Sequence, residues 1–263
     1  MEPFYLVCAY VLAGVLGLCV GSFLNVVIYR LPRNMSLAFP ASHCTVCHYS
    51  LKWYDNIPIL SWLLLGGKCR RCGEPISVRY TVVELANTVL WLLSVALFWE
   101  NNPIYAVICA VVCSAAICIF FIDLEHLLIY NRFLLILFAA GIVALFFDES
   151  TVPLDHLIGA GVGGGVFALL YAGAILLLKR EALGFADVKF AAAIGWLLGW
   201  QKLLLTVLVA SVAGSVVLVT LNRVKQQERT TEYPFGPFLV GGMLIALLAG
   251  TPIIEWYVGL LLG

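Results

Sequence analysis

Eight long apolar runs dominate the sequence and constrain what it can fold into. A helix needs about 20 apolar residues to cross the hydrocarbon core of a bilayer, and only the sixth run is clearly too short. We therefore expect an all-α polytopic membrane protein with about eight transmembrane helices, the sixth of them short or tilted. The runs lie at residues 5–29, 81–99, 104–122, 127–147, 156–178, 188–200, 202–221 and 235–262.

The charged residues are few and balanced. Only 11% of the residues are charged, against roughly 25% in a soluble domain, and the formal net charge is zero. A protein without a basic field lacks the electrostatic attraction on which nucleic-acid binding depends. We therefore expect membrane lipid around the chain and no nucleic-acid partner, while the oligomeric state is left open.

The basic residues predict the orientation of the chain. Fourteen of the fifteen lie in alternate connections, at residues 30–80, 123–132, 179–189 and 222–234, and only Lys202 falls on the opposite side. Loops rich in Lys and Arg stay in the cytoplasm, so both termini are expected outside, in the periplasm of a Gram-negative bacterium. The chain then divides into a first transmembrane helix (1–29), a cytoplasmic loop (30–80) and a larger membrane domain (81–263).

The cytoplasmic loop carries two CxxC pairs. Cys44 and Cys47 are separated by 21 residues from Cys69 and Cys72. Two such pairs are typical of a zinc ribbon, because each supplies two thiolates to one tetrahedral ion, and the metal adds folding energy that a 50-residue loop cannot draw from its own core. Reduced structural thiols and disulfides are the alternatives, the latter disfavoured in the cytoplasm. A site closed by four thiolates has a structural role.

Two acidic residues are expected at the same membrane face. Asp123 closes the third apolar run, and Asp187 precedes the sixth. Two carboxyls that share a site do not both ionise, so one keeps its proton while the other acts as a base toward water, as in aspartyl proteolysis. The alternative is that each aspartate only caps a helix or pairs with Lys189 or Arg132.

The chain resembles the bacterial type IV prepilin peptidase family over most of its length. The similar segments occur in the same order as in the family. The ordered set is far more specific to the family than any one segment. They are Gly21–Pro32, Cys44–Cys47, Trp53–Pro58, Leu60–Trp62, Gly67–Cys72, Ile76–Tyr80 with Val83 and Glu84, Phe121–Glu125, Gly184–Lys189 and Tyr233–Leu239.

The resemblance implies an inner-membrane enzyme with two activities. Such enzymes cleave the leader peptide of prepilins and pseudopilins at the cytoplasmic face and then methylate the new N-terminus with S-adenosylmethionine. Asp123 and Asp187 match the catalytic pair, and Arg79 and Glu84 are weak candidates for binding the cofactor or the new amine. The competing interpretation makes Arg79 a membrane anchor and Glu84 its ion-pair partner. Other functions left open are a peptidase without methyltransferase activity and a non-enzymatic scaffold or transporter with a zinc loop.

Two further features give testable expectations. Ala186 stands where the family's Gly-x-Gly-Asp block has its second glycine. Alanine would be strained there if the backbone had a positive φ, but we expect a tolerated variant because Gly184 and Asp187 keep their spacing. The glycine-rich stretch Gly159 to Gly165 is expected to be a close-packing helix face.

Overall fold

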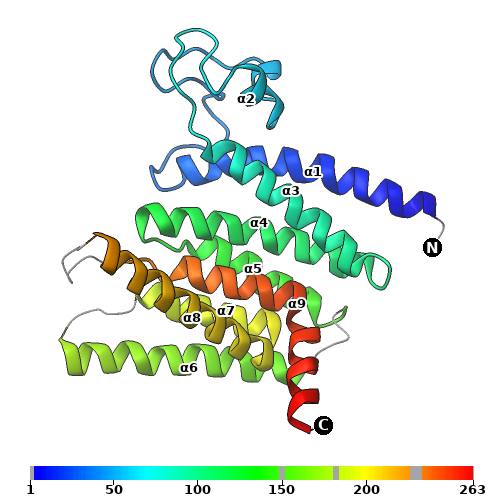
Figure 1. The fold of residues 1–263 in the computed structure, drawn as a ribbon, viewed down its shortest axis with the longest axis vertical. Coiled ribbons are helices and arrows are strands. Elements are labelled where there is room, and N and C mark those ends of the chain that lie inside the picture. The colour runs from blue at the N-terminus through cyan, green and yellow to red at the C-terminus, as the bar shows by residue number, and fades with distance from the viewer. Residues whose placement is uncertain (1–2, 148–151, 180–183, 226–232, 263) are drawn as a thin grey trace. The chain divides into compact units, whose positions relative to one another are not determined.

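The chain folds almost entirely into helices (Figure 1). The computed structural model describes residues 3–147, 152–179, 184–225 and 233–262. Within these residues the only β-structure is a pair of isolated bridges, so the all-α expectation is confirmed. The helices are α1 (Pro3–Arg30), η1 (Trp53–Asp55, a 3-10 turn), α2 (Leu60–Leu64), α3 (Arg79–Phe98), α4 (Pro103–His126), α5 (Asn131–Ala144), α6 (Pro153–Leu178), α7 (Phe185–Leu198), α8 (Trp200–Lys225) and α9 (Gly236–Leu262).

Each of the eight apolar runs contains a helix, but two of the helices are short. Six are long and apolar enough to cross a membrane, namely α1, α3, α4, α6, α8 and α9. The shortness expected of the sixth run is confirmed by α7, with 14 residues. The full-length span expected at 127–147 is wrong: α4 ends because Leu127 has φ 55°, and α5 does not begin until Asn131.

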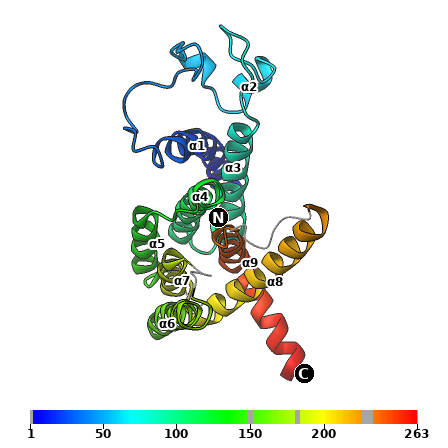
Figure 2. The same ribbon diagram turned by 90° about the vertical axis from the view of Figure 1, so that its left-hand side faces the viewer.

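The chain forms two compact units, residues 1–118 and 119–263. In the first unit α1 and α3 pack side by side, and the loop with η1 and α2 joins their ends (Figure 2). The two helices approach each other closely at two glycines of α1. A Cβ on Gly17 would lie 2.9 Å from the Cα of Thr88, and one on Gly21 would lie 2.8 Å from the Cα of Glu84. Larger residues at these positions would force the helices apart.

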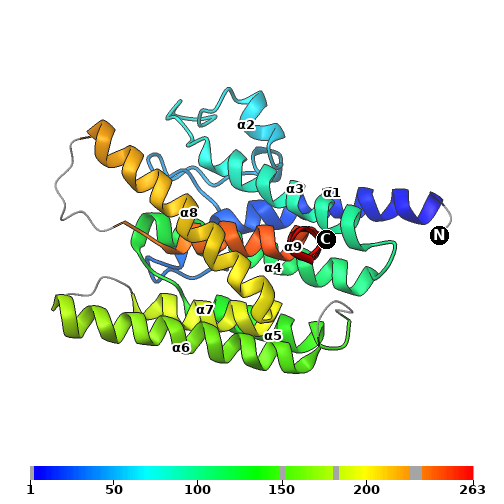
Figure 3. The same cartoon turned by 60° about the horizontal axis from the view of Figure 1, so that its bottom comes forward.

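In the second unit α7 packs closely against α6, and α8 packs against α9 (Figure 3). Gly159 and Gly163 of α6 lie against the backbone of α7, at Gly195 and Ala191, with no room for a Cβ. The close-packing role expected for this glycine-rich stretch is thereby confirmed at these two positions. α5 covers another side of α7, where Trp196 donates a hydrogen bond to the carbonyl of Phe138 (3.0 Å).

Candidate functional site

The four loop cysteines lie together in two knuckles of similar backbone geometry. In each knuckle the first cysteine accepts a backbone hydrogen bond from the residue four positions later, from His48 to Cys44 (3.0 Å) and from Gly73 to Cys69 (2.9 Å). Both of these later residues have positive φ, 54° and 72°. An isolated β-bridge closes each turn, His43 with Ser50 and Lys68 with Pro75. Each CxxC pair is thus held by its own backbone.

The geometry of the thiols fits zinc. All four Sγ atoms lie within 4.8 Å of one another. The Sγ atoms of Cys44 and Cys72 are 3.8 Å apart, and those of Cys47 and Cys69 are 3.9 Å apart. A tetrahedral ion with zinc–sulfur bonds of about 2.3 Å would place its ligands about 3.8 Å apart. The described thiols therefore match a four-thiolate zinc site.

Backbone hydrogen bonds favour the thiolate form in both knuckles. The N–H groups of Cys47 and Val46 lower the pKa of Cys44 to about 6, and those of Cys72 and Arg71 lower the pKa of Cys69. A metal ligand must be deprotonated, so these N–H groups prepare the first cysteine of each pair for binding.

Asp55 organises the rest of the loop. Its carboxylate accepts hydrogen bonds from the side chain of Arg70 (2.6 Å), the backbone of Lys52 (3.2 Å) and the hydroxyl of Tyr49 (3.1 Å). Burial acts to raise the pKa of Asp55, but these hydrogen bonds outweigh it and hold the pKa below its usual value. The ionised carboxylate therefore stabilises the loop above about pH 4, and this stabilisation is lost as the pH falls further.

We expect Asp55→Ala to destabilise the loop by roughly 1–3 kcal/mol at pH 7, because it removes the buried acceptor of three hydrogen bonds, one of them from a charged guanidinium. Amide hydrogen exchange of residues 42–77 measures the change. The matched control is Glu74→Ala, which removes an exposed acid from the same loop. Equal exchange rates in the two variants would contradict the role assigned to Asp55.

The two aspartates singled out by the sequence both lie in the second unit. Asp123 is on the last turn of α4 and is 5% exposed, and Asp187 is on the first turn of α7 and is 9% exposed. The two carboxyls are close enough to interact electrostatically. Oδ2 of Asp123 is buried and has no hydrogen-bond partner among the described residues. Two nearby carboxyls, one with an unused buried oxygen, can share a proton and activate a water molecule.

The alternative roles of these aspartates, helix capping and ion pairing with Lys189 or Arg132, are only partly seen in the structure. Asp187 accepts a hydrogen bond from the backbone N–H of Gly184 (3.2 Å), so it does cap α7. It does not pair with Lys189, whose ammonium group donates instead to Asn131 (2.8 Å). Among the described residues neither aspartate forms an ion pair. Helix capping therefore uses one oxygen of Asp187. It does not account for the other oxygen of Asp187 or for the buried carboxyl of Asp123.

Gly236 is a site residue that the sequence did not single out. It begins α9, and a methyl group at this position would overlap the carboxylate of Asp123. The segment Tyr233–Leu239 carried part of the family resemblance, but nothing in its spacing indicated a contact with Asp123. The structure thus brings a third segment against the aspartate pair.

Ala186 lies in the first turn of α7, and its φ is not positive. The family's second glycine is therefore not needed here for backbone conformation. The strain that a positive φ would impose on alanine is absent, and the tolerance of this variant stays a prediction.

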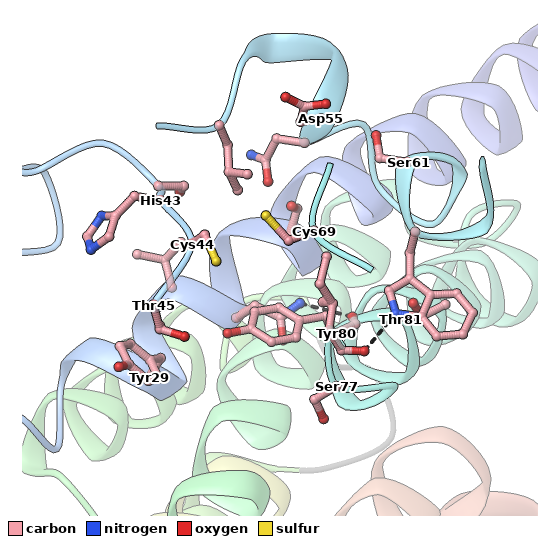
Figure 4. Close-up of a pocket in the computed structure, with 18 of the residues that line it drawn as sticks. Tyr29, His43, Cys44, Thr45, Asp55, Ser61, Cys69, Ser77, Tyr80 and Thr81 are labelled. Carbon is pink, nitrogen blue, oxygen red and sulfur yellow. Dashed lines mark hydrogen bonds between the residues drawn. The ribbon is translucent and has the colours of Figure 1, made fainter. Parts of the chain in front are cut away.

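A second feature is a cavity of about 530 Å³ in the first unit, between α1, α3 and the cysteine loop (Figure 4). Arg79 and Glu84 both line it, together with Cys44 and Cys69 from the loop. Glu84 accepts a hydrogen bond from the backbone of Ile59 (2.7 Å), and no ion pair joins it to Arg79 in the described structure. The interpretation of Glu84 as the ion-pair partner of Arg79 is therefore wrong.

Comparisons with known proteins match both units. The model of the bacterial peptidase A24 N-terminal domain matches residues 15–98, and that of the type IV leader peptidase family matches residues 110–219. No solved structure matches the chain significantly.

Similar curated proteins cover most of the chain. A prepilin leader peptidase/N-methyltransferase of Myxococcus xanthus is 40% identical over 84% of this chain and 67% of its own length. A prepilin leader peptidase/N-methyltransferase of Aeromonas hydrophila is 34% identical over 92% of this chain and 91% of its own length. The type 4 prepilin-like proteins leader peptide-processing enzyme of Escherichia coli is 37% identical over 89% of this chain and 91% of its own length. With both family models matched in order and such relatives aligned nearly end to end, the chain belongs to the type IV leader peptidase family of membrane aspartic peptidases.

Proposed function

We propose that the chain removes the leader peptide of prepilins or pseudopilins with Asp123 and Asp187 and then methylates the new N-terminal amine. The observation that carries the first step is that two buried carboxyls, from α4 and α7, lie close enough to interact electrostatically, with one oxygen of Asp123 unpartnered among the described residues. Relatives named prepilin leader peptidase/N-methyltransferase support both steps.

The hydrolysis follows from two carboxyls that hold one proton between them. The ionised carboxylate takes a proton from a water molecule, and the oxygen of that water attacks the scissile carbonyl carbon. The protonated carboxyl donates its proton to the substrate, and collapse of the tetrahedral intermediate breaks the C–N bond and releases an amine. The hydrogen bond from Gly184 holds Asp187 in place for this reaction.

The methyl group is proposed to come from S-adenosylmethionine bound in the cavity of the first unit. Arg79 and Glu84 line this cavity, whose volume is within the range of pockets that bind small molecules. Zinc held by Cys44, Cys47, Cys69 and Cys72 would fix the loop that closes the cavity. In the orientation predicted by the basic residues, this loop and the aspartate pair both lie at the cytoplasmic face of the inner membrane.

Incubation of the purified protein with a prepilin and S-adenosylmethionine tests both steps. We expect a shortened product that carries one added methyl group, read by mass spectrometry. A shortened product without the methyl group would identify a peptidase without methyltransferase activity. An uncut prepilin would contradict the proposed function and favour a scaffold or transporter.

We expect Gly236→Ala to lower the rate of leader removal by at least about 100-fold, because the added methyl group displaces the Asp123 carboxylate from its position. The matched control is Gly241→Ala on the same helix, where a Cβ meets no atom within 4 Å. The initial rate of prepilin cleavage measures both variants. Similar rates for the two would show that Gly236 does not constrain Asp123.

A further inference from the structure

The inner wall of the cavity in the first unit is built where α1 and α3 cross. Ser22 and Asn25 of α1 and Thr81 and Glu84 of α3 line this wall. The close contact of Gly21 with the backbone of Glu84 sets the two helices side by side at this point. Figure 4 shows Thr81 and Tyr80 on the helix side of the cavity and Cys44 and Cys69 on the loop side. The wall therefore combines polar side chains from two membrane helices.

Asn25 lines the cavity and has an unused acceptor. It is 2% exposed, and its Nδ2 donates to the carbonyls of Tyr80 (3.0 Å) and Gly21 (3.4 Å). Because both of these partners are acceptors, the orientation of the amide is fixed. Its Oδ1 is buried without a hydrogen-bond partner, as is Oγ1 of Thr81. Buried polar atoms in proteins are nearly always satisfied, so both atoms call for a partner, and each can accept a hydrogen bond.

Glu84 adds a negative charge to the same wall. It is 7% exposed and accepts a hydrogen bond from the backbone of Ile59 (2.7 Å). In the described residues no basic side chain pairs with it. The other buried carboxylate of the cavity, Asp55, is already neutralised by Arg70. A buried carboxylate without a cation is costly, so the wall favours a positively charged donor.

We propose that Asn25, Thr81 and Glu84 form a binding site for a primary ammonium group. Three acceptors, one of them charged, match the three N–H donors of such a group. Two molecules of the proposed reaction carry an amine: S-adenosylmethionine at its amino-acid end, and the cleaved substrate at its new N-terminus. This inference rests on the proposed function for the identity of those two molecules.

The test uses the purified full-length protein and two pairs of probes. The first pair is S-adenosylmethionine and 5′-methylthioadenosine, which lacks the amino-acid end. The second pair is a peptide with the mature N-terminal sequence and its N-acetylated counterpart. We expect the wild type to bind the amine-bearing member of one pair at least about tenfold more tightly, and Glu84→Gln to remove that preference.

Thr81→Val separates binding from folding, because it leaves the contact between Glu84 and Ile59 intact. It is expected to reduce the same preference by a smaller factor. Glu100→Gln, which changes an exposed acid outside the cavity, is the control and should keep the wild-type preference. Thermal unfolding of each variant reports whether the fold is retained.

The pair that shows the preference identifies the source of the ammonium group. A wild type without a preference in either pair, or a folded Glu84→Gln that keeps it, would overturn the proposal. Cleavage and methylation are assayed on the same preparations. A wild type that cleaves without methylating would refute the methyltransferase half of the proposed function, and the peptide pair would still test the ammonium site.

Discussion

Leader removal is expected to fall by at least about 1,000-fold when either Asp123 or Asp187 is replaced by asparagine. Asparagine keeps the size of the side chain but neither takes up nor releases a proton, and a positioned acid or base contributes about 10²- to 10⁴-fold. Because the two carboxyls act as a unit, the double variant should be no slower than the slower single variant. Initial rates of prepilin cleavage measure all three.

The control for these variants is Glu255→Gln, which changes an exposed acid on α9. It should cleave at the wild-type rate. Each variant must also insert into membranes at a similar level, which immunoblotting of the membrane fraction records. Cleavage at more than a tenth of the wild-type rate by either aspartate variant would remove that residue from the mechanism.

The second large effect is expected from loss of the metal. Cys44→Ser combined with Cys69→Ser removes one ligand from each knuckle, and the zinc content should fall from one ion per chain to near zero. Structural zinc contributes roughly 10–16 kcal/mol to small metal-binding folds, so the loop should unfold in the variant. Metal analysis of the reduced protein and amide exchange over residues 42–77 measure the two changes.

The metal variant also separates the two activities. The aspartate pair lies in the second unit and the cysteines in the first. We therefore expect methylation to be lost, with a smaller effect on cleavage. Cys19→Ser, which changes an exposed cysteine on α1, is the control. A zinc-free wild type with an ordered loop would contradict the structural role of the metal.

The helices were predictable because each requires only a run of apolar residues. Both CxxC pairs were predictable as a metal site because their spacing is local in the sequence. The gap between α4 and α5 was not, since Leu127, which adopts a left-handed conformation, opens the run that was expected to form one span. The same limit applies to the short length of α5.

Contacts between distant segments were harder to infer. Asp123 and Asp187 were expected to meet because charge counting placed both at one membrane face. Gly236 gave no such signal, because a glycine at a helix start is common and its contact with Asp123 depends on how α9 packs. The acceptor role of Asn25 was equally hidden, because it depends on which backbone carbonyls surround its amide group.

The short length of α5 and α7 has a consequence for how water reaches the aspartate pair. Fourteen residues extend about 21 Å, which is about 9 Å less than the hydrocarbon core. Lys189 and Asn131, which are hydrogen-bonded near the start of these helices, mark that end as hydrated. Asp187 lies on the same first turn of α7. We therefore expect water to reach the aspartates from this end of α7 without crossing the full hydrocarbon core.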